Sequence, residues 1–285
     1  MMPLEQPQSK VSDTIIQRDI FKEKGLGSTK GMTTDHPFFQ QIEEIMCEPD
    51  WAQQGGLADG DGTFTDRSKY RKAKSSPSYK LKMKDMEPIK FLADLYGANI
   101  SKTEFVNPKW KTNYIVNLYG VRALHFMKKV CPYLIEKRKH VTNLINQEEE
   151  YTPVKIPMNL GNISLMMGYT VGFFDAEGCI MFKLRKNGQY HRAVTFTNTD
   201  IRPLKKIQRF LTTKPFSYKG VTIGFHQAEG KKKCFKLYIG TKHQTSFLAI
   251  LEPLFQIERK KKKIEKFKLY NKISKICDKK PVKKG

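Results

Sequence analysis

GLADGDG at residues 56–62 and GFFDAEG at residues 172–178 decide the fold of this chain. Each stretch ends a segment of apolar and small residues with an acid followed at once by glycine, the residue that most often follows a helix end. The two acids, Asp61 and Glu177, lie 116 residues apart. A single acid–glycine dipeptide after a helix would carry little information. Two copies in matched surroundings predict a duplicated protein that brings two carboxylates together.

The two copies also match outside these stretches. Each has an aspartate followed by a helix with proline in its first turn, at residues 85–90 and 200–205. Each also has small residues at every fourth position, which lie on one helical face and would let two backbones approach closely. These are Ala52, Gly56 and Gly60 in the first copy, and Gly168, Gly172 and Ala176 in the second. Matched features in the same order indicate an internal duplication.

The composition points to a polyanionic partner. The 285 residues include 52 basic and 28 acidic ones, for a formal net charge of +24. Such an excess of basic residues usually indicates binding to nucleic acid, and an anionic membrane surface is the lesser alternative. No apolar run approaches the roughly 20 residues that a membrane-spanning helix needs. The five cysteines are scattered without a CxxC pair, so neither a zinc site nor a disulfide framework is indicated.

Hydrophobic patterning divides the chain into two repeats with flanking segments. Each repeat reads as helix, two strands, helix, two strands, helix. The boundaries are 1–47 for a polar N-terminal extension with at most a short helix near 36–47, 48–146 for the first repeat, 147–161 for a linker, 162–270 for the second repeat, and 271–285 for a basic tail. Residues from 257 onward are spaced like one more amphipathic helix, and the run of lysines at 260–263 is interpreted as solvated.

Strict alternation of apolar and basic side chains predicts strands with one buried face. In the second repeat this alternation runs up to Asn187-Gly188, a strong hairpin signal. The basic residues on the opposite faces of these strands are Lys80, Lys82, Lys84, Lys183 and Arg185. They would suit a nucleic-acid surface, and an ordinary solvent-exposed face is an equal alternative.

This order of elements, with small-residue helices that end in an acid before glycine, resembles the LAGLIDADG homing endonuclease family over about residues 48–270. The resemblance implies an α+β fold in which two αββαββα repeats form a pseudo-twofold saddle of antiparallel sheets along double-stranded DNA. The second motif, VGFFDAEG, matches closely. The first departs from the pattern, because Gly55-Gly56 is doubled and Gly60 stands where alanine is usual. An interior glycine costs a helix about 1 kcal/mol relative to alanine and would loosen it.

The resemblance also implies catalytic residues. Asp61 and Glu177 would meet above the scissile phosphates as metal ligands, since Mg²⁺ prefers hard oxygen ligands. The family places a basic residue after the third helix of each repeat, which is Lys137 in the first. Lys137 lies five residues after Pro132. In the second repeat the same count from Pro253 reaches Glu258, and we prefer Arg259, one residue further on.

Simpler roles for the acids remain open. Asp61 and Glu177 could merely cap helices in a scaffold without catalysis. For Asp59 and Asp175, which precede the final motif acids, capping or local hydrogen bonding is the preferred interpretation.

Two functions therefore compete. The first is a monomeric, Mg²⁺-dependent DNA endonuclease that makes a double-strand break at a long site, and it is favoured by the presence of both acids. The second is an RNA-binding protein on the same fold, either an intron maturase or a ribosomal RNA-binding component, and it is favoured by the departures in the first motif. A protein-binding scaffold would leave the charge unexplained. The lysine-rich composition and the family's distribution suggest a mitochondrion or chloroplast, although the N-terminus has no recognisable targeting peptide.

Overall fold

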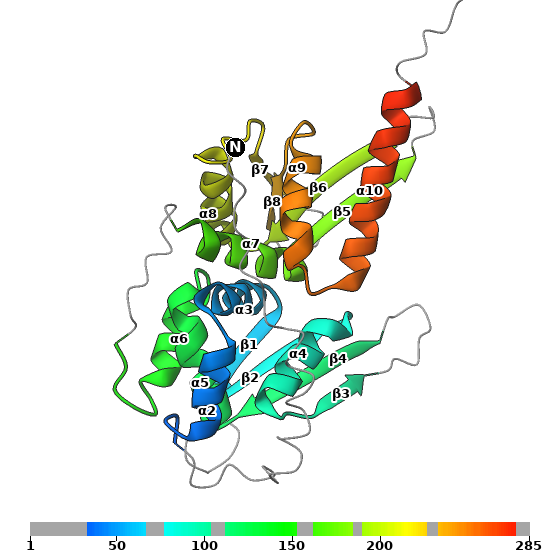
Figure 1. Cartoon of the computed structure of the whole chain (residues 1–285). Coiled ribbons are helices and arrows are strands. Elements are labelled where there is room, and N and C mark those ends of the chain that lie inside the picture. Colours follow the sequence, from blue (N-terminus) through cyan, green and yellow to red (C-terminus); the bar gives the residue numbers. More distant parts are fainter. Residues whose placement is uncertain are drawn as a thin grey trace, which may run out of the picture.

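The two halves of the chain build the same arrangement of elements, as the duplicated sequence predicts (Figure 1). The computed structural model describes residues 33–66, 77–103, 112–152, 162–184, 190–226 and 233–277. Arg185 and the predicted Asn187-Gly188 turn lie outside these described residues.

The first repeat surrounds one four-stranded antiparallel sheet of order β1-β2-β4-β3. Its elements are α2 (Pro37–Ile45), α3 (Glu48–Asp61), β1 (Gly62–Asp66), β2 (Pro77–Met83), α4 (Met86–Tyr96), β3 (Ile100–Thr103), β4 (Asn113–Tyr119), α5 (Val121–Val130), the 3-10 turn η3 (Cys131–Tyr133) and α6 (Arg138–Ile145). The predicted alternation in β2 is confirmed, because Tyr79, Leu81 and Met83 are buried and the lysines between them are exposed.

The second repeat has the same sheet order, β5-β6-β8-β7. Its elements are α7 (Ile163–Glu177), β5 (Gly178–Leu184), β6 (Tyr190–Asn198), α8 (Ile201–Thr212), β7 (Thr222–His226), β8 (Cys234–Tyr238), α9 (Gln244–Leu251), the 3-10 turn η4 (Glu252–Leu254) and α10 (Glu258–Cys277). The registers agree as well. Gly62 pairs with Leu81 in the first sheet, and Gly178 pairs with Phe196 in the second.

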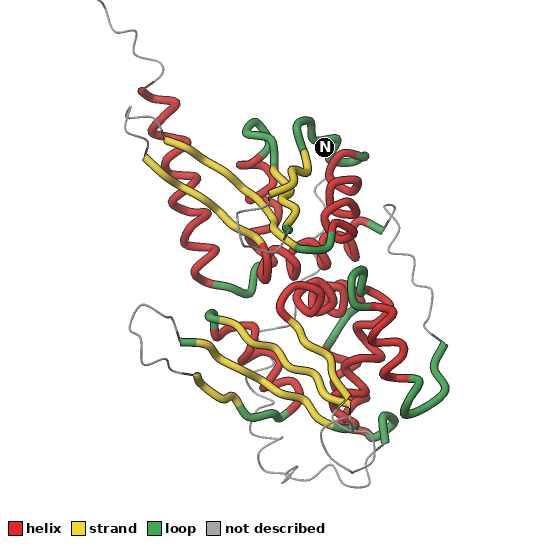
Figure 2. The backbone as a smooth tube through the Cα atoms, turned by 180° about the vertical axis from the view of Figure 1, so that it is seen from behind, coloured by secondary structure: helices red, strands yellow, loops and turns green. Residues whose placement is uncertain are grey.

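Within the described residues, the helices α4, α5 and α8 cover one face of each sheet. Helices α4 and α5 pack on β2 and β4, while α8 packs on β6 to β8. From behind, the strands of the first sheet run in front of α4 (Figure 2). No helix among the described residues is long and apolar enough to cross a membrane.

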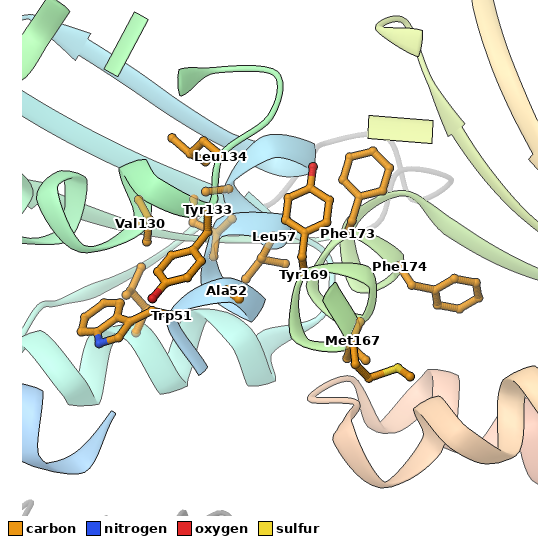
Figure 3. Close-up of a cluster of buried hydrophobic side chains, with 14 of the residues drawn as sticks. Trp51, Ala52, Leu57, Val130, Tyr133, Leu134, Met167, Tyr169, Phe173 and Phe174 are labelled. Atoms are coloured by element: carbon orange, nitrogen blue, oxygen red, sulfur yellow. The ribbon is translucent and has the colours of Figure 1, made fainter. Parts of the chain in front are cut away.

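The two repeats meet along α3 and α7, where the small residues predicted from the sequence permit close backbone contact. A Cβ on Gly172 would lie 1.8 Å from the Gln53 carbonyl oxygen, and one on Gly56 would lie 2.1 Å from that of Tyr169. Leu57 from α3 lies beside Tyr169 from α7 (Figure 3). Glycine is therefore required at both positions, because any side chain would push the two helices apart.

The departures in the first motif are packing features as well. A Cβ on Gly60 would lie 2.3 Å from the Cβ of Ala176, and one on Gly55 would lie 2.9 Å from the Cβ of Tyr133. Gly60 therefore accommodates the methyl group of Ala176. Whatever these glycines cost the helix in propensity, the absence of a side chain at both positions leaves room for a neighbouring residue.

Three helices differ from the sequence-based boundaries. The predicted short helix before residue 47 is α2, and it packs into the first repeat: Phe39 is fully buried and stacks on His125 with ring centroids 4.5 Å apart. Helix α6 lies where no helix was expected, with Val141 and Ile145 fully buried. Helix α10 continues beyond residue 270, into the predicted tail.

Candidate active site and nucleic-acid interface

The last residues of α3 and α7 are Asp61 and Glu177, so the two predicted catalytic acids end neighbouring helices. A Cβ on Gly60 would lie 3.2 Å from the Cγ of Glu177, which shows that the helix ends touch. The structure therefore brings together the two acids that the sequence singled out.

Both acids hold protons unusually firmly. Burial raises the pKa of Asp61 to about 6, although the charges of Lys260 and Lys137 oppose the shift. Burial also raises the pKa of Glu177 to about 7, and the negative charges of Asp61 and Glu136 add to the effect. Two carboxylates that repel each other in a partly buried site favour any cation that can lie between or beside them.

The preceding acids, Asp59 and Asp175, have a structural role that reaches across each repeat. Asp59 accepts hydrogen bonds from the backbone N–H groups of Ile135 at 2.6 Å, Glu136 at 3.1 Å and Lys137 at 3.0 Å. Asp175 accepts one from the backbone N–H of Gln256 at 3.2 Å. The preferred interpretation, capping or local hydrogen bonding, is wrong, because these hydrogen bonds join residues 76 to 81 positions apart and fix the segment that follows the third helix.

Lys137 lies where that segment meets the end of α3. Its Nζ donates to the carbonyl oxygens of Ala58 at 2.8 Å, Gly60 at 3.4 Å and Gly62 at 2.7 Å. Partial negative charge gathers at a helix C-terminus, so the ammonium group satisfies carbonyls that lack helical partners. The predicted basic residue of the first repeat is thus next to Asp61.

In the second repeat the counterpart of Lys137 is Lys260, and the preference for Arg259 is wrong. The Nζ of Lys260 donates to the carbonyl oxygens of Phe174 and, at 2.7 Å, Asp175. Phe174 lies at the same motif position as Ala58, the acceptor of Lys137. Lys260 is only 4% exposed, so it does not belong to a solvated run.

A signal in the sequence could have identified Lys260. Ile257, Ile264 and Phe267 form the buried stripe of this segment, and Lys260 lies on the same stripe at helical spacing. A lysine on an apolar face needs polar partners. The count from Pro253 failed because this repeat contains two more residues before the lysine than the first repeat does.

Arg259 instead joins the two repeats. Its guanidinium donates to both carboxylate oxygens of Asp85, at 2.8 Å and 2.7 Å. Asp85 precedes α4 of the first repeat, where the sequence predicted an N-cap, and its side chain makes no capping hydrogen bond. The counterpart Asp200 does cap its helix, by accepting from the Arg202 backbone N–H at 2.8 Å.

The residues fit a divalent cation that is shared with a substrate. No group of three or more His, Cys, Asp or Glu residues within the described ranges could hold a metal ion. Asp61 and Glu177 would supply two carboxylates, and the nearby ammonium groups of Lys137 and Lys260 are bonded to carbonyl oxygens. Such an incomplete oxygen site suits Mg²⁺, which keeps waters and takes phosphate oxygens as further ligands.

The basic face predicted for the sheets is present mainly in the first repeat. Lys80, Lys82 and Lys84 are exposed, and the charge of Lys84 acts on Asp61. Lys183 lies on β5, opposite His191.

By register, the second sheet has different residues at the positions of the first sheet's lysines. Thr195 and Thr197 on β6 take the places of Lys80 and Lys82 on β2. This sheet also carries Lys236 on β8, which pairs with Thr197 and whose Nζ lies 5.8 Å from the ring centroid of Tyr238. The sequence patterning missed Lys236.

Comparison with known proteins supports the family resemblance. Residues 170–274 match the family model described as LAGLIDADG endonuclease. No curated protein matches the sequence. The solved structure of the LAGLIDADG meganuclease I-AabMI bound to uncleaved DNA is 15% identical, with a TM-score of 0.50 over 79% of this chain and 91% of that one. This similarity confirms the fold.

Two further solved structures are similar at lower scores. The homing endonuclease I-GzeII in complex with its DNA target is 13% identical, with a TM-score of 0.46 over 80% of this chain and 90% of that one. I-DmoI in complex with DNA and Ca is 17% identical, with a TM-score of 0.42 over 72% of this chain and 89% of that one.

Proposed function

We propose that this chain is a site-specific double-strand DNA endonuclease that uses a divalent metal ion such as Mg²⁺. Its second repeat matches the LAGLIDADG endonuclease family model, and its two repeats share the fold of a LAGLIDADG meganuclease. The observation that carries the proposal is the meeting of Asp61 and Glu177 at the touching ends of α3 and α7. A scaffold would gain nothing from two carboxylates whose pKa values are raised by burial and repulsion.

The protein residues prepare this site for a phosphodiester. Asp61 and Glu177 would hold the metal, which when bound activates water and stabilises the leaving oxygen. Lys137 and Lys260 donate to carbonyl oxygens at the helix ends that carry these acids, and they would place positive charge beside the reacting phosphates. The exposed lysines of β2 would neutralise phosphates along the duplex and thereby set the protein's position on it.

One chain contains both repeats, so we take the working form as a monomer. A mitochondrion or chloroplast is the setting that the lysine-rich composition favours.

The test is cleavage of DNA that contains the chain's own coding locus and flanks, in Mg²⁺. The wild-type protein should produce one discrete double-strand cut. Asp61→Asn and Glu177→Gln should each abolish cutting and keep binding, because neutralising a carboxylate removes a metal ligand but leaves the basic sheet intact. Glu265→Gln, on the exposed side of α10, is the matched control and should cut normally.

One pair of results would overturn the endonuclease in favour of the RNA-binding alternative. It is the absence of a cut together with tight, reproducible binding to a structured RNA or to ribosomes. Cleavage that survives loss of both acids would contradict the site itself.

A further inference from the structure

A buried tyrosine of the second repeat contacts the acid that holds the Lys137 segment in the first. Tyr169 lies on α7 and is fully buried beside Leu57 of α3 (Figure 3). Its hydroxyl group donates to Oδ2 of Asp59 at 2.8 Å. The same carboxylate accepts hydrogen bonds from the backbone N–H groups of residues 135–137. One carboxylate therefore connects α7 of the second repeat to the segment that carries Lys137.

The tyrosine hydroxyl holds this carboxylate from outside the segment. Among the hydrogen bonds of the described residues, the other donors to Asp59 are the three backbone N–H groups that it orders. Hydrogen bonds to an ionised acceptor are strong, and a buried site strengthens them further. Tyr169 thus fixes the plane of the carboxylate independently of the segment. The segment in turn fixes the backbone from which Lys137 reaches the carbonyl oxygens of Ala58 and Gly62.

The second half of the active site lacks the matching bridge. Gln53 takes the place of the tyrosine on α3, 116 residues earlier, and it donates to the Leu254 backbone oxygen at 3.0 Å. Asp175, the counterpart of the bridging carboxylate, accepts a hydrogen bond from the Gln256 N–H at 3.2 Å. Its Oδ1 is buried and has no hydrogen-bond partner in the part of the chain that the structure describes. The half that contains Lys260 is therefore held differently.

We propose that Tyr169 is a positioning residue for Lys137, so that one half of the active site depends on a hydroxyl group supplied by the other repeat. This inference rests on the proposed function, because it concerns the same endonuclease site. Removing the hydroxyl leaves the Asp59 carboxylate held only by the backbone N–H groups that it has to order. The Lys137 ammonium group then shifts relative to the reacting phosphate, and a displacement of about 1 Å can slow a reaction by about 100-fold.

The test is single-turnover cleavage in Mg²⁺, with saturating protein and a duplex of the coding locus that is end-labelled on one strand or the other. Lys137→Met identifies the strand that depends on this lysine. Tyr169→Phe removes only the hydroxyl group and should slow cleavage of the same strand by at least about tenfold. Cleavage of the other strand should stay within about twofold of the wild-type rate, because a shift of Lys137 does not reach the second half.

Two further variants separate positioning from a loss of stability. Because Tyr169 acts through Lys137, adding Tyr169→Phe to Lys137→Met should not slow that strand further. Tyr96→Phe is the matched control. Tyr96 is also fully buried, and its hydroxyl lies 2.9 Å from Nδ1 of His125, within the first repeat. The control loses a buried hydroxyl too and should cut both strands at the wild-type rates.

The possible failures distinguish this inference from the proposed function. Equal slowing of both strands by Lys137→Met or Tyr169→Phe, normal cleavage by Tyr169→Phe, or additive effects in the double variant would overturn the inference and leave the endonuclease standing. A wild-type protein that cuts neither strand would instead contradict the endonuclease.

Hydrogen exchange tests the bridge without cleavage. Exchange at the amides of residues 135–137 should be faster in Tyr169→Phe than in Tyr96→Phe, because only the first variant releases the carboxylate that binds these amides. Equal exchange in the two variants would overturn the inference.

Discussion

At the residue scale, the two motif acids form a cation site but lower the stability of the folded protein when both are ionised. Their pKa values are raised to about 6 for Asp61 and about 7 for Glu177, against about 4 in an unfolded chain. The folded state therefore holds protons that the unfolded state has lost, and stability falls as the pH rises from about 4 to about 7.

We expect Asp61→Asn and Glu177→Gln each to increase the free energy of unfolding at pH 8 in EDTA by about 1–3 kcal/mol. The gain should shrink as the pH is lowered towards 4, where the carboxyl group is protonated in both states. Urea unfolding across this pH range measures the free energy of unfolding. The control Glu265→Gln should change that free energy little at any pH. Variants less stable than the wild-type protein at pH 8 would contradict the repulsion described above.

Lys260 and Lys262 lie two residues apart on α10 and make a matched pair. Lys260 is buried against the carbonyl oxygens of Phe174 and Asp175, whereas Lys262 is exposed. Removing one partner of a buried charge cluster costs about 3–5 kcal/mol, so Lys260→Ala should unfold at much lower urea concentration. Lys262→Ala should stay within about 0.5 kcal/mol of the wild-type protein. Equal effects would mean that Lys260 is only loosely held.

At the element scale, the contact between α3 and α7 can be tested with substitutions on both helices. Helix propensity alone predicts that Gly60→Ala stabilises α3 by about 1 kcal/mol. The structure predicts the opposite sign, because the new Cβ would lie 2.3 Å from the Cβ of Ala176. Adding Ala176→Gly removes that methyl group, so the double variant should recover most of the stability. A stabilised single variant would show that the helices separate more readily than the packing implies.

The elements show why sequence reasoning succeeded at the helix ends and failed nearby. Asp61 and Glu177 were predictable because each is fixed by a local pattern, an acid before glycine at the end of a small-residue helix. Lys260 was not found by counting, because its position depends on a tertiary contact with Phe174 across 86 residues. Helix α6 was missed because it has only 8 residues and lies directly before the acidic run of the predicted linker.

At the scale of the whole molecule, the two sheets of this chain with a net charge of +24 differ at matched strand positions. The first sheet exposes Lys80 and Lys82 on the face opposite α4, whereas the second sheet has threonines at the matched positions. Phosphate contacts release counterions, so the charges that touch a nucleic acid determine how steeply its binding depends on salt.

We expect affinity for a duplex DNA of about 30 base pairs to fall steeply with salt, with a log–log slope of about −0.9 for each phosphate contacted. Lys80→Ala and Lys82→Ala should each reduce the slope by about 0.9. Lys90→Ala is the matched control, because Lys90 is exposed on α4, which covers the opposite face of the same sheet. Fluorescence anisotropy across a salt series measures all four proteins. A flat salt dependence would point to a protein partner, and an equal effect of Lys90→Ala would show that the open face of the sheet is not the binding surface.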